Sequence, residues 1–203
     1  MMDIKIIDVS GVFGLMAMVA LTVNILLGMV LSTPYKTFAL WKKLPEKLRR
    51  YSINDLHNIT AYIALSLVLI HPLLLLLDAG TEFTFIDILF PVKAPHQKLI
   101  VTLGTVSMFA LFIVIITTQK VIKRKLSFRA WKNIHLISYG TALLFFIHGI
   151  AMDPLLKDRD VDYFDGEKFL CEACLVVVIA AAVIRYRYYT GQKSLKKATT
   201  LNN

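Results

Sequence analysis

Four of the chain's five histidines lie in two strongly apolar stretches of the sequence. His57 and His71 are fourteen residues apart in the first stretch, and His135 and His148 are thirteen residues apart in the second. Histidine inside a bilayer is costly and usually functional, and its imidazole is a common axial ligand of haem iron. The two spacings therefore favour two haem sites, although a single such histidine is as well explained by a hydrogen bond to a neighbouring helix.

The composition predicts that these stretches are membrane helices. The chain is 57% hydrophobic and only 18% charged, against roughly 25% charge in soluble domains. Five apolar runs each approach the roughly 20 residues that span a hydrocarbon core. They are Val12–Leu31, Asp55–Leu77, Leu99–Thr118, Ile134–Met152 and Phe169–Ile184, with an extension of the last run to Tyr189 left open. The expected fold is an all-α bundle of about five transmembrane helices, a single domain over residues 1–203 that ends in a basic cytoplasmic tail at residues 188–203.

The charges alternate in sign from one connecting segment to the next. Residues 33–55 carry six basic and two acidic side chains, residues 119–132 carry six basic and no acidic ones, and residues 185–203 carry five basic and no acidic ones. Most of the acids fall in the other segments. Because Lys and Arg accumulate on the cytoplasmic side, we expect the amino terminus outside and the carboxyl terminus in the cytoplasm. The net charge of +9 is then a topology signal and predicts no nucleic-acid binding.

This topology places the histidines in matched pairs. The two histidine-bearing helices run in the same direction, so His57 and His135 lie at one depth near the cytoplasm, and His71 and His148 lie at another near the outer face. Two imidazoles at equal depth on facing helices fill both axial positions of one haem iron, and thirteen or fourteen residues of helix rise about 20 Å. The pairs therefore predict two stacked b-type haems, one in each leaflet.

The thirteen-residue spacing does not fit a regular helix as well as the fourteen-residue spacing. Fourteen residues return to within about 40° of the starting face, whereas thirteen leave an offset of about 140°. Either the helix carries a tightened turn near Gly140, or its two histidines approach their haems from different sides. The sequence leaves both possibilities open.

The paired spacings resemble those of the ferric reductase-like transmembrane family. H-x13-H on one helix and H-x12-H on the next but one is the pattern of this family, which includes NADPH oxidases, iron reductases and the membrane subunit of bacterial periplasmic methionine sulfoxide reductase. The segment TTQKVIKRKLSFRAWKNIHLISYGTALLFFIH, residues 117–148, is similar to the last group in its basic loop, its R-x-W-K-x-x-H motif and its second histidine. The resemblance covers about residues 51–187 and implies a bacterial inner-membrane location.

The resemblance also implies the ligands, the cofactors and the direction of electron flow. It assigns His57 with His135, and His71 with His148, as axial ligands of two haems b, and it implies outward electron transfer from a cytosolic flavin. The sequence contains no G-x-G-x-x-G motif for a dinucleotide. We therefore expect FMN or FAD to be supplied by a separate cytosolic flavin reductase or flavoprotein.

Basic residues near the inner pair are candidates for binding haem propionates, because Arg and Lys pair with carboxylates. Those within a turn or two of His57 and His135 are Arg49, Arg50, Arg129 and Lys132. For the outer haem, the weaker candidates are His96, Gln97 and Lys98 at the start of the third helix. The alternative explanation is positive charge that only sets the topology.

Two further motifs lie near the outer face. Cys171 and Cys174 form a C-x-x-C at the outer end of the fifth helix, and they are either a redox dithiol or two small buried residues. The acidic stretch at residues 158–165 lacks the glycine at position six of a calcium loop. A solvated loop explains this stretch better, with a weak attraction for ferric ions left open.

The function expected from these features is electron transfer through two bis-histidine haems to an acceptor on the outer side. The sequence leaves that acceptor open among a protein, ferric iron, oxygen and a quinone. NADPH oxidases carry another histidine one turn beyond the outer ligand, and the matching position here is Leu75, which argues against a dedicated superoxide producer. The alternatives are a quinone-linked cytochrome b that anchors a dehydrogenase, and a haem-free transporter or assembly factor.

The cytoplasmic loops predict where the electron donor docks. Together they carry twelve basic side chains, and such a surface steers an oppositely charged partner. We expect the flavoprotein to bind Lys42, Lys43, Arg49, Arg50, Lys123, Arg124 and Lys125. The alternative partner of these charges is anionic membrane lipid.

Overall fold

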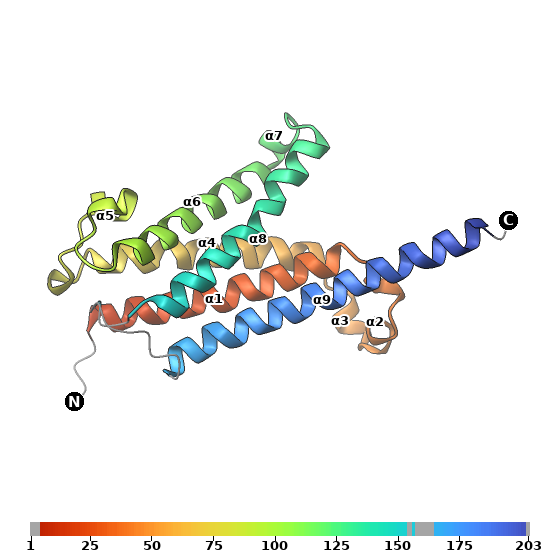
Figure 1. Cartoon of the computed structure of the whole chain (residues 1–203), viewed down its shortest axis with the longest axis horizontal. Helices are drawn as coiled ribbons and strands as arrows, with labels where there is room; N and C mark the ends of the chain where they lie inside the picture. The colour runs from red at the N-terminus through yellow and green to blue at the C-terminus, as the bar shows by residue number, and fades with distance from the viewer. Residues whose placement is uncertain (1–4, 154–155, 157–164, 202–203) are drawn as a thin grey trace.

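The computed structural model is all-helical over the residues that it describes, which are 5–153, 156 and 165–201. Five helices in this part of the chain are long and apolar enough to cross a membrane, which confirms the predicted number. They are α1 (Ile6–Leu31), α4 (Ile53–Leu75), α6 (Lys98–Thr118), α8 (Phe128–Ala151) and α9 (Gly166–Leu201). In Figure 1, α1 begins and α9 ends at opposite ends of the bundle, as an odd number of spans requires.

Two helices begin more than one turn earlier than the apolar runs indicate. Both α1 and α8 start six residues before their predicted first residues, Val12 and Ile134. The hydroxyl of Ser127 accepts a hydrogen bond from the N–H of Ala130 and caps α8, so the helix continues through the basic turn before the apolar run. The early start of α1 places Ser10 inside the helix, where it meets α4.

The last helix is longer than predicted. The hydrophobic run ends near residue 184, yet α9 continues to Leu201 and extends beyond the rest of the bundle in Figure 1. The extension is anchored near its start, since the Tyr189 hydroxyl donates to the carbonyl oxygen of Ser32 and the Tyr188 ring packs against Phe38. Residues 188–201 of the predicted tail are therefore helical.

Short helices connect the spans at both ends of the bundle. The basic connections contain η1 (Tyr35–Thr37), α2 (Ala39–Lys43) and α3 (Glu46–Arg49) between α1 and α4, and α7 (Lys120–Lys123) between α6 and α8. The opposite end contains η2 (Ala79–Thr81), α5 (Phe85–Leu89) and η3 (Pro91–Lys93) between α4 and α6. Of the predicted acidic loop at 158–165, only Asp165 is described.

The spans pack as two close pairs with the fifth helix against both. α1 lies along α4, α6 lies along α8, and α9 contacts α1 and α8. Small residues are fully buried where helices approach one another, as Ala17 and Ala64 are at 0% exposure, which is typical of membrane bundles. In the described part of the chain, α4 and α8 are not a closely packed pair. The two histidine-bearing helices therefore leave a space between their backbones.

Candidate functional site

The four membrane histidines meet in two pairs across the space between α4 and α8. The ring centroids of His57 and His135 are 6.0 Å apart with an interplanar angle of 71°, and those of His71 and His148 are 6.4 Å apart at 78°. We call these the inner pair and the outer pair, after the expected topology. Each pair takes one ring from each helix, as the matched depths in the sequence predict.

The spacing of each pair suits one iron between two imidazoles. A metal–imidazole nitrogen bond of about 2 Å on each side places two ring centroids roughly 6 Å apart. Among the described residues, no group of three or more His, Cys, Asp or Glu side chains could hold a metal ion. Each pair offers only two donor nitrogens. Two donors suit haem better than a bare ion, because the porphyrin supplies four further nitrogens. The residues present therefore fit a haem at each pair.

Three of the four imidazoles are positioned by the same backbone element, which we call the carbonyl–glycine cradle. It consists of a residue whose carbonyl oxygen accepts a hydrogen bond from histidine Nδ1, and of a glycine four residues later that leaves room for the ring. The cradles are Ser10 and Gly14 for His71 (O···Nδ1 2.7 Å), Asn24 and Gly28 for His57 (3.0 Å), and Ile100 and Gly104 for His148 (2.8 Å).

A side chain at these glycines would crowd the imidazoles, most of all at Gly104. A Cβ on Gly14 would lie 3.2 Å from His71, one on Gly28 would lie 3.2 Å from His57, and one on Gly104 would lie 2.7 Å from His148. The cradle also leaves Nε2 of each ring as the nitrogen free to bind a metal, because Nδ1 donates to the carbonyl.

The two cradles on α1 hold their histidines at a second point. The Ser10 hydroxyl donates to the backbone carbonyl of His71 at 2.8 Å. The Asn24 amide donates to the backbone carbonyl of His57 at 2.5 Å and to the Thr60 hydroxyl at 2.9 Å. Both the ring and the backbone of each histidine on α4 are therefore fixed by one residue of α1.

His135 is the exception. Its Nδ1 is buried and has no hydrogen-bond partner among the described residues, and the same holds for Nε1 of Trp131. The two rings are stacked, with centroids 5.4 Å apart and planes 18° apart. The ammonium of Lys123 lies 4.0 Å from the centroid of the Trp131 ring. An aromatic stack therefore positions this imidazole in place of a carbonyl.

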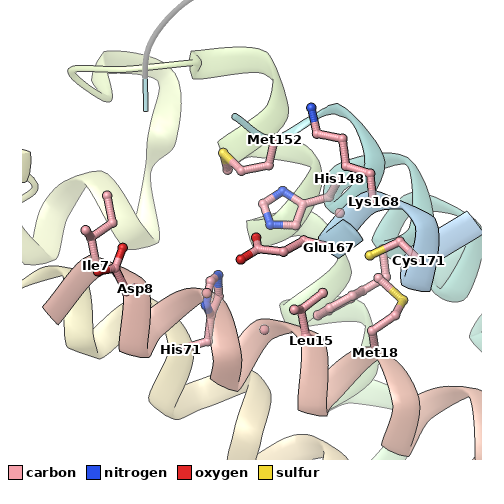
Figure 2. A pocket seen from close by; sticks show the side chains of 14 residues that line it. Ile7, Asp8, Leu15, Met18, His71, His148, Met152, Glu167, Lys168 and Cys171 are labelled. Carbon is pink, nitrogen blue, oxygen red and sulfur yellow. The ribbon is translucent and has the colours of Figure 1, made fainter. Parts of the chain in front are cut away.

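Cavities lie on both sides of the outer pair. One, of about 100 Å³, opens between α1, α8 and α9 and is lined by Gly14, Met18, Glu167 and Cys171 beside the two histidines. Figure 2 shows Glu167 directed into this cavity, towards the region between His71 and His148. A second cavity, of about 50 Å³, lies towards α6 and is lined by Leu75, Gly104 and Ile88. Empty space on both sides of an imidazole pair would accommodate a flat macrocycle held by the pair.

Lys168 and the two cysteines are buried at the outer end of the bundle. Lys168 is only 4% exposed and lines the larger cavity. Cys171 and Cys174 are free thiols at 1% and 8% exposure. A Cβ on Gly149 would lie 3.0 Å from the Cys171 sulfur. Both thiols are part of the core between α1, α8 and α9.

The candidate propionate ligands lie at the surface. Arg49, Arg50, Arg129 and Lys132 are all exposed, and Arg50 forms an ion pair with Glu46 at 3.2 Å. At the outer end, Lys98 is exposed, Gln97 accepts a hydrogen bond from the backbone of Asp153, and His96 packs near Phe83.

The structure decides how α8 accommodates its thirteen-residue spacing. α8 is assigned as α-helix from Phe128 to Ala151 without a tightened turn near Gly140. His135 and His148 therefore leave the helix on sides about 140° apart. This is the second of the two possibilities that the sequence left open.

The cradle residues were missed at the level of sequence, although a signal for them exists. Ser10 and Asn24 are fourteen residues apart, as are Gly14 and Gly28, and this equals the spacing of His57 and His71. The equal spacing on two neighbouring apolar runs would have paired these residues. Lys168 was also missed, because nothing in the sequence distinguishes it from the other charges near the outer face.

Comparison with known proteins gives one match. The family model described as "Ferric reductase like transmembrane component" matches residues 13–147. The matched segment begins in α1 and ends one residue before His148, so it includes both α1 glycines of the cradles. No curated protein and no solved structure matches the chain.

Proposed function

Because the chain belongs to the ferric reductase-like transmembrane family, whose members act in transmembrane electron transfer as oxidoreductases, we propose that it carries electrons from a cytosolic flavin to an acceptor outside. The observation that supports this best is the pair of facing imidazoles at each of two depths, 6.0 and 6.4 Å apart. His57 and His135 would hold one haem b, and His71 and His148 would hold the other. Each bound haem would supply a one-electron ferric–ferrous couple.

The separation of the two pairs along α4 supports one haem site in each half of the membrane. His57 and His71 are separated by fourteen residues of one unbroken α-helix, a rise of about 20 Å. That distance places one site in each half of a hydrocarbon core about 30 Å thick. Because each pair would supply two imidazole ligands to its iron, an acceptor on the outer side would be reduced without binding to the metal.

The basic end of the bundle is the docking surface for the donor. The seven predicted docking residues lie on or beside α2, α3 and α7, and all are exposed. Their positive charge attracts an acidic flavin reductase or flavoprotein that carries FMN or FAD, and this attraction weakens with salt. Anionic lipid headgroups are the competing occupant of the same charges.

Basic side chains at each end neutralise haem carboxylates. Arg49, Arg50, Arg129 and Lys132 flank the start of α4 and the first turns of α8, within reach of the inner site for long flexible side chains. At the outer site Lys168 is the better candidate, because the residue is only 4% exposed and lines the larger cavity.

The visible spectrum of purified protein is the decisive first experiment. Protein from haem-replete cells is expected to hold two haems b per chain with a low-spin bis-histidine spectrum. A colourless preparation would contradict the proposal and leave a haem-free transporter or assembly factor. A single haem per chain would mean that one pair is wrongly assigned.

The donor is tested in inside-out vesicles, where the basic end is accessible. Reduction of the haems by a cytosolic flavin reductase is expected to slow with ionic strength, and to slow further when Lys123, Arg124 and Lys125 are changed to Gln. Rapid, salt-insensitive reduction by quinol alone would replace the flavoprotein with a quinone-linked dehydrogenase as the partner. Unchanged rates in the Gln variant would assign these charges to topology and lipid.

A further inference from the structure

The inner pair differs from the outer pair in how its imidazoles are supported. At the outer pair, Nδ1 of both rings donates to a backbone carbonyl, from His71 to Ser10 and from His148 to Ile100. At the inner pair only His57 does so. Nδ1 of His135 is buried without a partner among the described residues, and the flat face of its ring lies against Trp131.

This difference changes the donor strength of the ligands. An Nδ1–H that donates to a carbonyl makes the imidazole more basic, so its other nitrogen binds a metal more strongly. An imidazole without that bond is a weaker donor and stabilises the more highly charged, oxidised metal less. Hydrogen bonding around the axial ligand is one of the features by which a protein sets a haem potential.

The charges around the two pairs act in the same direction. Lys123 lies over Trp131 at the basic end of the bundle, and positive charge near a metal favours its reduced form. The cavity at the outer pair is lined by the carboxylates of Asp8 and Glu167 together with Lys168. The carboxylates outnumber the ammonium there, which favours the oxidised form.

The position of Trp131 explains why His135 stays unbonded. Trp131 precedes His135 by one turn of α8, and long side chains of a helix lie over the preceding turn. The indole stacks on the imidazole, and Nδ1 of His135 is inaccessible to water. Nε1 of Trp131 can only donate a hydrogen bond, so it cannot accept one from Nδ1 of His135.

We propose that Trp131 is a positioning residue that keeps His135 the weakest of the four ligands, so that the inner site has the higher reduction potential. This inference rests on the proposed function. It assigns Trp131 a role that acts through His135 and not by contact with the reacting atoms. Removal of the indole admits water to Nδ1, strengthens the ligand and lowers the inner potential towards the outer one.

A potentiometric titration of the purified haem-loaded protein tests the proposal. The component that His135→Ala removes is expected to be the one of higher potential. Trp131→Ala is expected to lower that component by about tenfold in its reduction equilibrium constant, about 59 mV for a one-electron couple, and to leave the other unchanged. Trp131→Phe preserves the stack and is expected to keep both potentials. Trp41→Ala changes the chain's other tryptophan, whose ring packs on Tyr35, and is the matched control.

The outcomes separate this inference from the function on which it rests. Protein without haem contradicts the proposed function itself. Protein with two haems in which Trp131→Ala changes neither potential, or changes the component that His71→Ala removes, overturns only the role of Trp131. If Trp131→Ala does not accumulate, Trp131→Ser and Trp131→Phe decide in the same titration, because the short Ser side chain leaves Nδ1 open to water and Phe covers it. Equal potentials in those two variants would overturn the role of Trp131.

Discussion

At the outer pair both imidazoles donate from Nδ1 to a backbone carbonyl, at 2.7 Å for His71 and 2.8 Å for His148, whereas at the inner pair only His57 does so. The helices that carry the pairs are the same two, α4 and α8. The difference comes from their neighbours: α1 supports both histidines of α4, but α6 supports only one histidine of α8.

The helical repeat explains this asymmetry. On α1 and α4 the paired residues recur every fourteen positions, so both helices drift by the same small angle of about 40° between the two sites. One antiparallel contact can then serve both depths. On α8 the histidines recur after thirteen positions and point about 140° apart, so α6 cannot face both in the same way. α6 accordingly has a single glycine, Gly104.

Removal of one histidine of a pair should have the largest effect on the haem spectrum. We expect His71→Ala and His148→Ala to lose the same spectral component, and His57→Ala and His135→Ala to lose the other, because an imidazole pair that lacks one member no longer holds its haem. Haem content, measured as the pyridine haemochrome, should fall by about half in each variant.

The fifth histidine is the control for the ligand variants. His96→Ala is expected to keep both components, since His96 packs near Phe83 and belongs to neither pair. Loss of the same component from His57→Ala and His148→Ala would show that the pairing across α4 and α8 is wrong.

Changing a cradle glycine to alanine should weaken haem binding at one pair and leave the other pair unchanged. The methyl group of Gly104→Ala would lie 2.7 Å from Cε1 of His148, so the ring must move. Disturbing such outer contacts typically costs 10–100-fold in metal affinity, and we expect a loss of that size at the outer site by haem titration. Gly14→Ala, at 3.2 Å from His71, should cost less at the same site.

One other glycine provides a matched control for the cradle variants. A Cβ on Gly140 would meet no atom within 4 Å, so Gly140→Ala should bind haem like the parent protein. Equal haem loss in Gly104→Ala and Gly140→Ala would point to a general effect on helix packing and would remove the cradle as the explanation.

The Asn24 and Ser10 side chains on α1 bond to the backbones of His57 and His71. We expect the loss of such a side chain to destabilise the inner pair more than the outer pair. Asn24→Ala removes the bonds to the backbone of His57 and to Thr60, each worth about 1 kcal/mol. Since His57 is the only carbonyl-bonded ring of its pair, we expect the inner spectral component to be lost first on heating. Ser10→Ala leaves both outer rings bonded through backbone carbonyls and should lower the outer transition less. The reverse order would indicate that the inner pair does not depend on the Asn24 side chain.

Protonation of Asp87 in α5 by acid should destabilise the outer pair and leave the inner pair unchanged. This is the smallest expected effect. The hydroxyl and N–H of Thr84 donate to the Asp87 carboxylate at 2.6 and 2.9 Å and lower its pKa below the ordinary value of 3.8. A lowered pKa stabilises the fold above the ordinary value, and this stabilisation is lost as the pH falls through the lower value in the folded protein. The carbonyl of Ile88, next to Asp87, accepts a bond from Thr105 on α6 and Ile88 lines the smaller outer cavity.

Spectra in a pH series test this effect. Below about pH 4 the outer component should become less stable in the parent protein, and Asp87→Asn should show a weaker pH response because its side chain does not titrate. An equal acid response of both components in both proteins would remove α5 as the cause.

The sequence by itself determined the number of spans and the pairing of depths. Five apolar runs of sufficient length can be stable in a bilayer only as helices, because the backbone groups must be satisfied within each segment. The alternation of charge gives an expected direction to each helix, and equal spacing along helices of known rise then places His57 level with His135, and His71 level with His148. These conclusions depend on length, charge and rise alone.

The tertiary structure alone decided what supports each imidazole. A backbone carbonyl such as that of Ile100 has no sequence signature, and a glycine such as Gly104 is common in membrane helices for other reasons. Which side of α8 carries His135, and that Trp131 covers it, depends on whether the helix keeps its 3.6-residue repeat through Gly140. Hydrogen bonds and stacking depend on the rotation and distance between helices, which packing decides and which a linear pattern does not contain.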